Sequence, residues 1–172
     1  MEETVVLGGG CFWCTEAVFA MLKGVKRVEP GYARAHLATP TYEQVSAGNT
    51  GHIEVIKIDY DLDAIAFEEI LRVFFASHDP TTPGRQGNDV GEQYSSVIFY
   101  TTERQRAKAQ HYIDVLNKSG VLRIVTKVLP LKKFYAAEDY HKKYFENNTS
   151  APYCQLIIAP KVKSIEKKFK NL

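Results

Sequence analysis

The order of strand-like and helix-like segments is the feature of this sequence that most restricts its fold. Residues 52–60, HIEVIKIDY, alternate with the period of two that is typical of a strand. Residues 66–78 then repeat apolar side chains at helical spacing, at Phe67, Ile70, Leu71, Phe74 and Phe75. Further strand-like runs lie at residues 4–9, 25–33, 95–101 and 122–129. Further helical patterns lie at residues 12–23, 41–48, 102–116 and 136–146.

This alternation predicts helices packed on a sheet. No G-x-G-x-x-G fingerprint accompanies the strands, so a Rossmann fold is not expected. Several connections are long or hairpin-like, which favours the α+β class, as a two-layer α/β sandwich with a mixed sheet. The sequence contains no repeat and no linker rich in Pro, Gly or Ser, so we interpret residues 1–172 as one domain.

Charge and hydropathy argue against several functional classes. The 172 residues carry a formal net charge of only +2, so a dedicated nucleic-acid binder is not expected. No run approaches the roughly 18 apolar residues of a membrane helix. The one basic cluster, residues 160–172, is interpreted as an amphipathic helix docked on the domain, with a site for an acidic partner as the alternative. Its apolar side chains are Val162, Ile165, Phe169 and Leu172.

Cysteine usage indicates an intracellular protein with free thiols. The chain has three cysteines, an odd and sparse number that does not suit a secreted disulfide framework. Its first residues, MEETVVLGGG, leave no room for the charged and apolar regions of a signal peptide. We therefore expect a cytoplasmic protein whose thiols are available for chemistry.

The stretch GGGCFWCTE, residues 8–16, places Cys11 between three glycines and the start of a predicted helix. Glycines allow unusual backbone angles and close approach of a ligand. The free N–H groups and partial positive charge of a helix start stabilise a thiolate. We therefore expect Cys11 to have a depressed pKa and to act as a nucleophile. The alternative is a small buried residue at a strand–helix corner.

The other two cysteines have less specific surroundings. Cys14 lies one helical turn after Cys11, where it could form a redox pair with it or pack as a half-buried helix residue. Cys154 lies in NNTSAPYCQLI, a segment with little local regularity. It could be an incidental thiol or a resolving thiol that closes a disulfide with a sulfenic acid. A zinc site is not expected, because a structural site needs four ligands and the five histidines are scattered.

Several residues could complete a site around Cys11. Phe12 and Trp13 could cage a methyl or thioether group, since sulfur–aromatic contacts are favourable, or could simply be core. Glu54 is in phase with two isoleucines on its strand, so burial should raise its pKa and keep it protonated as a general acid, unless it reaches solvent at the strand end. The loop at residues 78–94 and Tyr42 could bind a ligand or lie in solvent.

Five blocks in this order resemble the A-class peptide methionine sulfoxide reductases. The blocks are GGGCFWCTE, PTYEQVSAGNTGHIEV, HDPTTPGRQGNDVGEQYSS, AEDYHKKYF and PYCQ, and together they span nearly the whole chain. The resemblance implies a ferredoxin-like core with an extended irregular C-terminal region. It also implies thiol-dependent reduction of the S epimer of methionine sulfoxide, free or in proteins, followed by recycling with thioredoxin.

The resemblance also implies roles for individual residues. Cys11 aligns with the family's nucleophile and Glu54 with the acid that protonates the sulfoxide oxygen. Cys154 falls where many members carry a resolving cysteine, and Cys14 occupies a position that varies among members. The implied substrate-binding residues are Phe12 and Trp13 for the methyl group, Tyr42 and Tyr94 for the oxygen, and Asp89 as support.

The expected chemistry needs no metal and no organic cofactor, and we expect a monomer. One departure concerns the family's glycine-rich GYxGG stretch, which reads GYARAH at residues 31–36 and leaves the local loop shape open. Two other functions remain possible from the residues alone. One is a thioredoxin-like dithiol oxidoreductase that uses Cys11 and Cys14, and the other is a non-catalytic peptide-binding module with an aromatic methionine cage.

Overall fold

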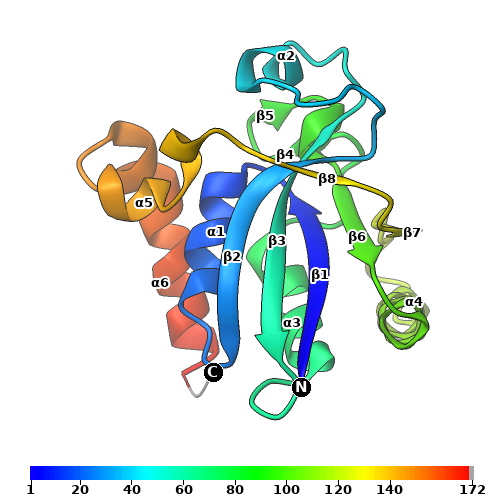
Figure 1. Ribbon diagram of the computed structural model, residues 1–172. Helices are drawn as coiled ribbons and strands as arrows, with labels where there is room; N and C mark the ends of the chain where they lie inside the picture. Colours follow the sequence, from blue (N-terminus) through cyan, green and yellow to red (C-terminus); the bar gives the residue numbers. More distant parts are fainter. Residues whose placement is uncertain (171–172) are drawn as a thin grey trace.

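The computed structural model describes residues 1–170 and has a six-stranded sheet at its centre (Figure 1). The strands are β1 Glu2–Gly9, β2 Val25–Ala33, β3 Ile53–Asp61, β6 Ser96–Tyr100, β7 Lys127–Pro130 and β8 Phe134–Ala136. They lie in the order β7-β6-β1-β3-β2-β8. Neighbours are antiparallel except β6 and β7, which are parallel, so the sheet is mixed as predicted.

Four of these strands and two helices form a ferredoxin-like core. Helix α1, Phe12–Ala20, joins β1 to β2, and helix α3, Phe67–Ser77, follows β3 and precedes β6. The four strands lie in the order β6-β1-β3-β2 and are all antiparallel. This is the βαββαβ arrangement of the ferredoxin-like fold. The predicted two-layer sandwich with this core is therefore confirmed.

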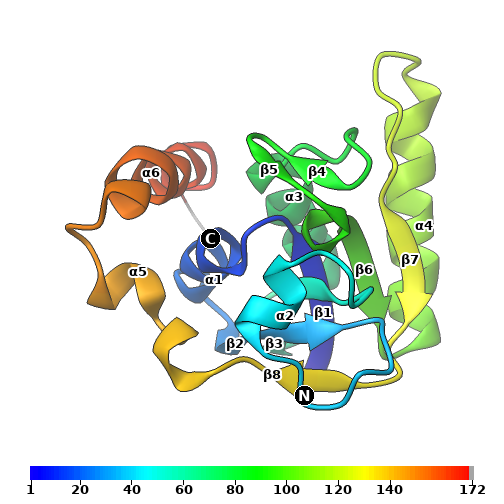
Figure 2. The same ribbon diagram turned by 90° about the horizontal axis from the view of Figure 1, so that it is seen from above.

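The helices α1 and α3 cover one face of the sheet, together with the C-terminal helix α6, Ala159–Lys168 (Figures 1 and 2). The predicted stripe of α3 packs inward, because Phe67, Ile70, Leu71 and Phe74 are buried in the main core, while Phe75 is half-buried. Strand residues such as Ile56 and Ile58 form the other side of this core. Burial of these side chains supplies the main stabilisation of the layer.

The opposite face of the sheet carries a smaller core. Its buried residues are Val6, Ala33, Ile53, Val55, Val97 and Phe99. Residues 131–133, which connect β7 to β8, run across this face, and Leu131 and Phe134 pack against the buried set. Both faces of β1 and β3 are therefore covered, which explains why β3 is apolar on both faces at its start.

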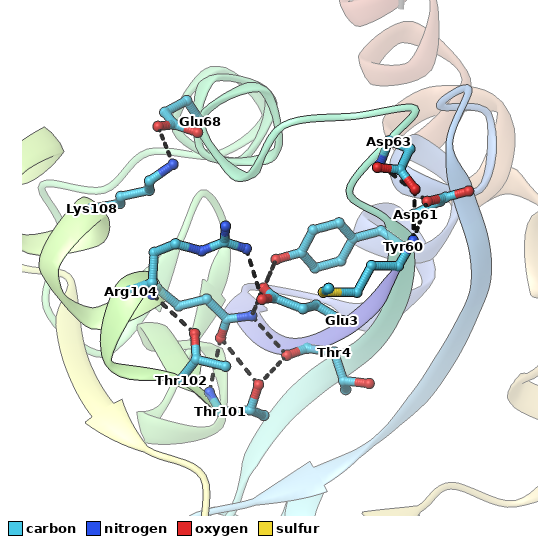
Figure 3. Close-up of polar contacts among 12 residues, drawn as sticks. Glu3, Thr4, Tyr60, Asp61, Asp63, Glu68, Thr101, Thr102, Arg104 and Lys108 are labelled. Carbon is cyan, nitrogen blue, oxygen red and sulfur yellow. Dashed lines mark hydrogen bonds and ion pairs between the residues drawn. The ribbon is translucent and has the colours of Figure 1, made fainter.

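Helix α4, Glu103–Lys118, is attached to the sheet by a buried polar network (Figure 3). The side chain of Gln105 is fully buried, and its amide nitrogen donates to the Thr4 carbonyl at 2.9 Å and to the Tyr60 hydroxyl at 3.1 Å. The same nitrogen donates to Glu3 at 3.2 Å, and Glu3 also accepts from Tyr60 and Arg104. Every partner of the Gln105 nitrogen in this network lies at the start of β1 or the end of β3.

The start of α4 forms only one half of a capping box between Thr102 and Gln105. The Thr102 hydroxyl accepts from the Gln105 backbone N–H at 3.1 Å, as expected. The Gln105 side chain does not return this bond to Thr102. Its oxygen accepts from the backbone N–H of Thr101 at 2.8 Å instead, because its nitrogen is directed toward Thr4 and Tyr60.

Two predictions for the last third of the chain are wrong in extent. The strand predicted at residues 122–129 is only Lys127–Pro130. The helix predicted at residues 136–146 is instead the end of β8, a 3₁₀ turn at Asp139–His141 and the short helix α5, Tyr144–Asn147. Lys143 separates the last two with a left-handed φ of +53°, which no continuous α-helix allows.

The C-terminal helix begins earlier than Pro160 suggests. A π-helical turn, Cys154–Ile158, runs directly into α6. Ile165 is buried and Val162 and Phe169 are half-buried, which agrees with a docked amphipathic helix; Leu172 lies outside the described residues. The regular structure at Cys154 contradicts the expectation that this cysteine lies in an irregular segment.

The long predicted loop at residues 78–94 contains short elements. Strands β4, Arg85–Gln86, and β5, Asp89–Val90, form a separate two-stranded sheet, and a 3₁₀ turn follows at Glu92–Tyr94. The short helix predicted after residue 40 is α2, Tyr42–Ser46. Figure 1 shows α2, β4 and β5 at the end of the sheet where α1 starts. Within residues 1–170, no helix has both the length and the apolar character needed to cross a bilayer.

Candidate active site

Cys11 occupies the predicted corner between β1 and α1. It is the N-cap residue of α1, and its carbonyl accepts from the backbone N–H groups of Cys14 at 3.1 Å and Thr15 at 3.3 Å. Gly10 has a φ of +93°, and a Cβ there would come within 2.6 Å of the Gln86 side chain. The glycine therefore allows the chain to turn sharply and lets Gln86 pack directly against the backbone before Cys11.

The pKa of Cys11 differs from the sequence prediction. A hydrogen bond with the Cys14 thiol, followed by burial and the nearby Glu54 charge, raises the pKa of Cys11 well above its usual value. The same hydrogen bond lowers the pKa of Cys14 to about 7. The prediction of a depressed pKa at Cys11 is therefore wrong for this state. The two thiols therefore titrate as a pair, and the direction of the two shifts favours the proton on Cys11 over the proton on Cys14.

Glu54 is placed as the sequence predicts. Its side chain is buried, with a residue exposure of 2%, and its Oε2 accepts from the backbone N–H of Phe12 at 3.1 Å. Burial raises the pKa of Glu54 to about 8, and this hydrogen bond only partly opposes the rise. Glu54 therefore keeps its proton at neutral pH, and it lies next to Phe12, the residue after Cys11.

Phe12 and Trp13 form part of an aromatic cluster at this site. Phe12 is fully buried, while Trp13 remains partly exposed. The ring of Tyr42 lies 6.4 Å from that of Phe12 and 6.1 Å from that of Trp13, centroid to centroid, and stacks with both. The Trp13 indole also stacks on Tyr144 at 3.8 Å. These rings offer an apolar wall next to Cys11, suited to a methyl-sulfur group.

The remaining predicted residues, Tyr42, Tyr94 and Asp89, are close enough to Glu54 to interact with it electrostatically. Burial is the main cause that raises the pKa of Tyr94, and the charges of Glu54 and Asp89 add to it. Burial likewise raises the pKa of Tyr42, followed by the charge of Glu54. Both phenols therefore stay protonated as hydrogen-bond donors. The charge of Asp89 also helps to raise the pKa of Glu54.

Four site residues were not assigned a role by the sequence reasoning. Glu138 accepts from the Tyr32 hydroxyl and from the Tyr42 backbone N–H, each at 3.0 Å. Buried His141 accepts from the Trp13 indole N–H at 2.9 Å. The other two are the tyrosines Tyr144, which stacks on Trp13, and Tyr153. The blocks AEDYHKKYF and PYCQ were the only signal for these residues, because the segment was interpreted as a helix.

Tyr153 connects the cysteines to the loop after α3. Its hydroxyl donates to Asp89 at 3.3 Å and lies 3.8 Å from the Cys14 sulfur. Asp89 and the thiols, which are far apart in the sequence, are thereby held at one site. The expected grouping of Asp89 with Cys11 and Glu54 follows from this contact together with the charges described above.

The three cysteines lie together and none forms a disulfide. Cys154 is fully buried and packs in one apolar cluster with Cys14 and Ile158, and Cys11 borders this cluster. Burial, followed by the Cys14 charge, raises the pKa of Cys154. Cys14 therefore packs in one cluster with Cys154, and Cys11 lies at the border of that cluster. In residues 1–170, no group of three or more His, Cys, Asp or Glu side chains is arranged to hold a metal ion.

This combination defines a class of thiol enzyme. A cysteine lies at the start of a helix, a second thiol that is coupled to it packs nearby, and a buried carboxylic acid accepts a hydrogen bond from the next residue. A dithiol alone would suffice for disulfide exchange. The protonated acid and the aromatic wall suit a substrate with an apolar group and an oxygen that must be protonated.

Comparisons with known proteins agree with this class. The family described as "Peptide methionine sulfoxide reductase" matches residues 3–172. The peptide methionine sulfoxide reductase MsrA of Acinetobacter baumannii strain AYE is 50% identical over 170 residues, which cover 99% of this chain and 98% of that protein. The chain belongs to the peptide methionine sulfoxide reductase family. It is an enzyme that reduces methionine sulfoxide with its thiols.

Solved structures show the same fold. Reduced Mxr1 from Saccharomyces cerevisiae superposes with a TM-score of 0.83 at 29% identity, over 89% of each chain. Mxr1 in complex with Trx2 superposes with a TM-score of 0.59 at 21% identity, over 83% of this chain and 84% of that one.

Proposed function

We propose that this enzyme acts on the S epimer of methionine sulfoxide, free or in proteins, with Cys11 as nucleophile and thioredoxin as reductant. The observation that carries the proposal is the buried, protonated Glu54 next to the start of the Cys11 helix. A sulfoxide sulfur becomes electrophilic only when its oxygen is hydrogen-bonded or protonated. Neither a disulfide exchanger nor a peptide-binding module needs such an acid.

Substrate activation is assigned to Glu54 with Tyr42 and Tyr94. Glu54 protonates the sulfoxide oxygen, and the two phenols donate hydrogen bonds to it where negative charge develops. The raised pKa values of all three groups keep them protonated near neutral pH. Phe12 and Trp13 hold the methyl group, since Phe12 is buried and Trp13 lies stacked between neighbouring rings.

The oxygen then passes from the substrate to Cys11. As the Cys11 sulfur attacks the sulfoxide sulfur, its proton moves to the coupled Cys14 thiolate. The oxygen then shifts to the Cys11 sulfur: its bond to the substrate sulfur breaks and its bond to the Cys11 sulfur forms. The sulfur–sulfur bond made in the attack breaks, methionine leaves with that electron pair, and a sulfenic acid remains on Cys11. Methionine sulfoxide is reduced by two electrons and Cys11 is oxidised by two. Asp89 supports this geometry through Tyr153, which contacts Cys14.

The geometry supports Cys14 as the first resolving thiol. Attack of Cys14 on the Cys11 sulfenic acid forms a disulfide and releases water. Cys154, packed against Cys14, then attacks the Cys14 sulfur and returns Cys11 to its thiol form. Direct resolution by Cys154, the favoured interpretation of the sequence, remains the alternative for this step. In both cases the final disulfide contains Cys154, and the external reductant reduces this disulfide.

Thioredoxin is the proposed reductant because Mxr1, which shares the fold, has been solved in complex with Trx2. Dithiol exchange with such a protein reduces the final disulfide without another cofactor. We further propose that the enzyme works as a monomer in the cytoplasm, where free thiols are maintained. The rival function, a dithiol oxidoreductase that ignores sulfoxides, is not favoured by the family relationship.

The proposal is tested with the two pure epimers of methionine sulfoxide and thioredoxin as reductant. We expect turnover of the S epimer only. Cys11→Ser should abolish it, and Cys154→Ser should release about one methionine per enzyme and then stall. Equal rates with both epimers, or sustained thioredoxin-dependent turnover by Cys154→Ser, would contradict the corresponding assignment.

A further inference from the structure

A groove on the face of the sheet opposite the helices has no part in the chemistry above. It has a volume of about 310 Å³ and lies between the residues after β2 and the segment that joins β7 to β8. Its apolar lining includes Phe99, Leu129, Leu131 and Tyr135. Phe99 is buried at the base of the smaller core, and Leu131 packs beside it. The groove therefore has an apolar floor next to the buried smaller core.

The rim of this groove is entirely basic. Arg34, His36, Lys132 and Lys133 line it, and no carboxylate does. His36, Lys132 and Lys133 are exposed and take part in none of the ion pairs found within residues 1–170. Arg34 is paired with Glu92, so Lys132 and Lys133 supply the unneutralised positive charge of the groove, on a chain whose net charge is only +2.

Arg34 connects the groove to the active site. Its guanidinium donates to the Gly51 carbonyl at 2.8 Å, three residues before Glu54, and to the Glu92 carboxylate at 2.9 Å, two residues before Tyr94. Arg34 also has a φ of +95°, a conformation that is costly for a residue with a side chain. A glycine at this position would avoid that cost.

We propose that this basic groove binds an acidic, unfolded segment of an oxidised protein substrate, on one side of its methionine sulfoxide. This inference rests on the proposed function, because it assumes that the methionine sulfoxide at Cys11 belongs to a polypeptide. Apolar side chains of the segment enter the groove over Leu129 and Leu131, and its carboxylates face Lys132 and Lys133. The segment passes Arg34 on its way to the site. Aliphatic side chains on the floor suit a peptide better than a nucleic-acid backbone.

The test compares short unstructured peptides that contain one methionine sulfoxide and are rich either in Glu and Leu or in Gln and Leu. We expect the acidic peptide to have the lower KM, with kcat similar for both, and the difference to shrink at high salt. The double variant K132E/K133E should raise the KM for the acidic peptide about tenfold, as expected when exposed pairs are replaced by repulsion. Free methionine sulfoxide should be turned over as before.

The matched control is K23E/K118E, which makes the same charge change at two exposed lysines outside the groove. An equal loss in this control, or no preference for the acidic peptide in the wild type, would overturn the proposal. Stronger binding of a labelled single-stranded oligonucleotide than of the acidic peptide would also overturn it. Binding of the acidic peptide with unoxidised methionine, measured by fluorescence anisotropy, separates the two proposals. Binding that depends on the groove, without reduction of any sulfoxide, would contradict the proposed function but not the proposed role of the groove.

Discussion

Replacement of Glu54 by Gln should make this protein less active and more stable at the same time. The carboxylic acid of Glu54 is buried and accepts a hydrogen bond from the Phe12 N–H, which the oxygen of a glutamine amide can also accept. The amide cannot transfer a proton to a sulfoxide oxygen. We therefore expect turnover near pH 7 to fall by at least about a hundredfold, the usual range for loss of a general acid, and the difference from the wild type to shrink above about pH 8, where Glu54 itself loses its proton.

The stability gain follows from the pKa of Glu54. Its pKa is about 8 in the folded protein, against 4.5 for the free side chain. Below pH 4.5 both states hold the proton and the group has no effect. As the pH rises from 4.5 to 8, the unfolded state loses the proton while the folded state keeps it, so unfolding becomes easier. At about 1.4 kcal/mol per pKa unit, the full cost above pH 8 is about 4–5 kcal/mol, as an upper limit.

Gln has no titration and avoids this cost, so Glu54→Gln should unfold at higher urea concentration than the wild type at pH 8 and at a similar concentration near pH 4.5. The assay is urea unfolding of both proteins under reducing conditions across this pH range. Glu166→Gln, a change of an exposed carboxylate on α6, serves as the control and should show no such trend. A stability difference that is independent of pH, or a variant less stable than the wild type at pH 8, would show that Glu54 is not held as a buried neutral acid.

Three further predictions test other parts of the structure. Cys14→Ser should accumulate the Cys11 sulfenic acid after one turnover, detected by adding a sulfenic-acid-specific label at increasing times and measuring the labelled Cys11 by mass spectrometry. A rapid fall in the amount of Cys11 that can be labelled would show that Cys154 resolves the sulfenic acid directly. The profile of kcat/KM against pH should rise through about 7, as the Cys11–Cys14 pair loses a proton, and fall above about 8, as Glu54 deprotonates. Gln105→Leu should lower the free energy of unfolding by about 2–4 kcal/mol, since it removes hydrogen bonds to buried Tyr60 and Thr4, and it should leave kcat unchanged. A parallel loss of kcat in the folded variant would contradict the position of this network away from the site.

The sequence predicted the elements whose pattern is local. Strand Ile53–Asp61 and helix Phe67–Ser77 have clear periods and lie within a residue or two of their expected bounds. The glycines before Cys11 indicated the turn into α1. The position of Glu54 on the same strand face as two isoleucines indicated that it is buried. These features depend on neighbours along the chain, so one sequence is enough to recognise them.

The features that were missed depend on long-range contacts. The residues around Glu138 resemble a helix by spacing, but Glu138 is held by Tyr32 and Tyr42, about a hundred positions earlier in the chain. Cys154 is buried because a π-helical turn packs it against Cys14, which no local pattern indicates. The pKa of Cys11 was predicted from the helix start alone. The neighbouring Cys14 thiol and burial reverse that effect.

The most direct test of the thiol relay is to map oxidised sulfurs after a single turnover of the reduced enzyme with methionine sulfoxide. Samples quenched at increasing times are alkylated and analysed by mass spectrometry. We expect a Cys11–Cys14 disulfide to appear first and a Cys14–Cys154 disulfide to replace it. A Cys11–Cys154 disulfide that forms before any disulfide of Cys14 would contradict the relay, and oxidation that spares Cys11 would contradict its role as the nucleophile.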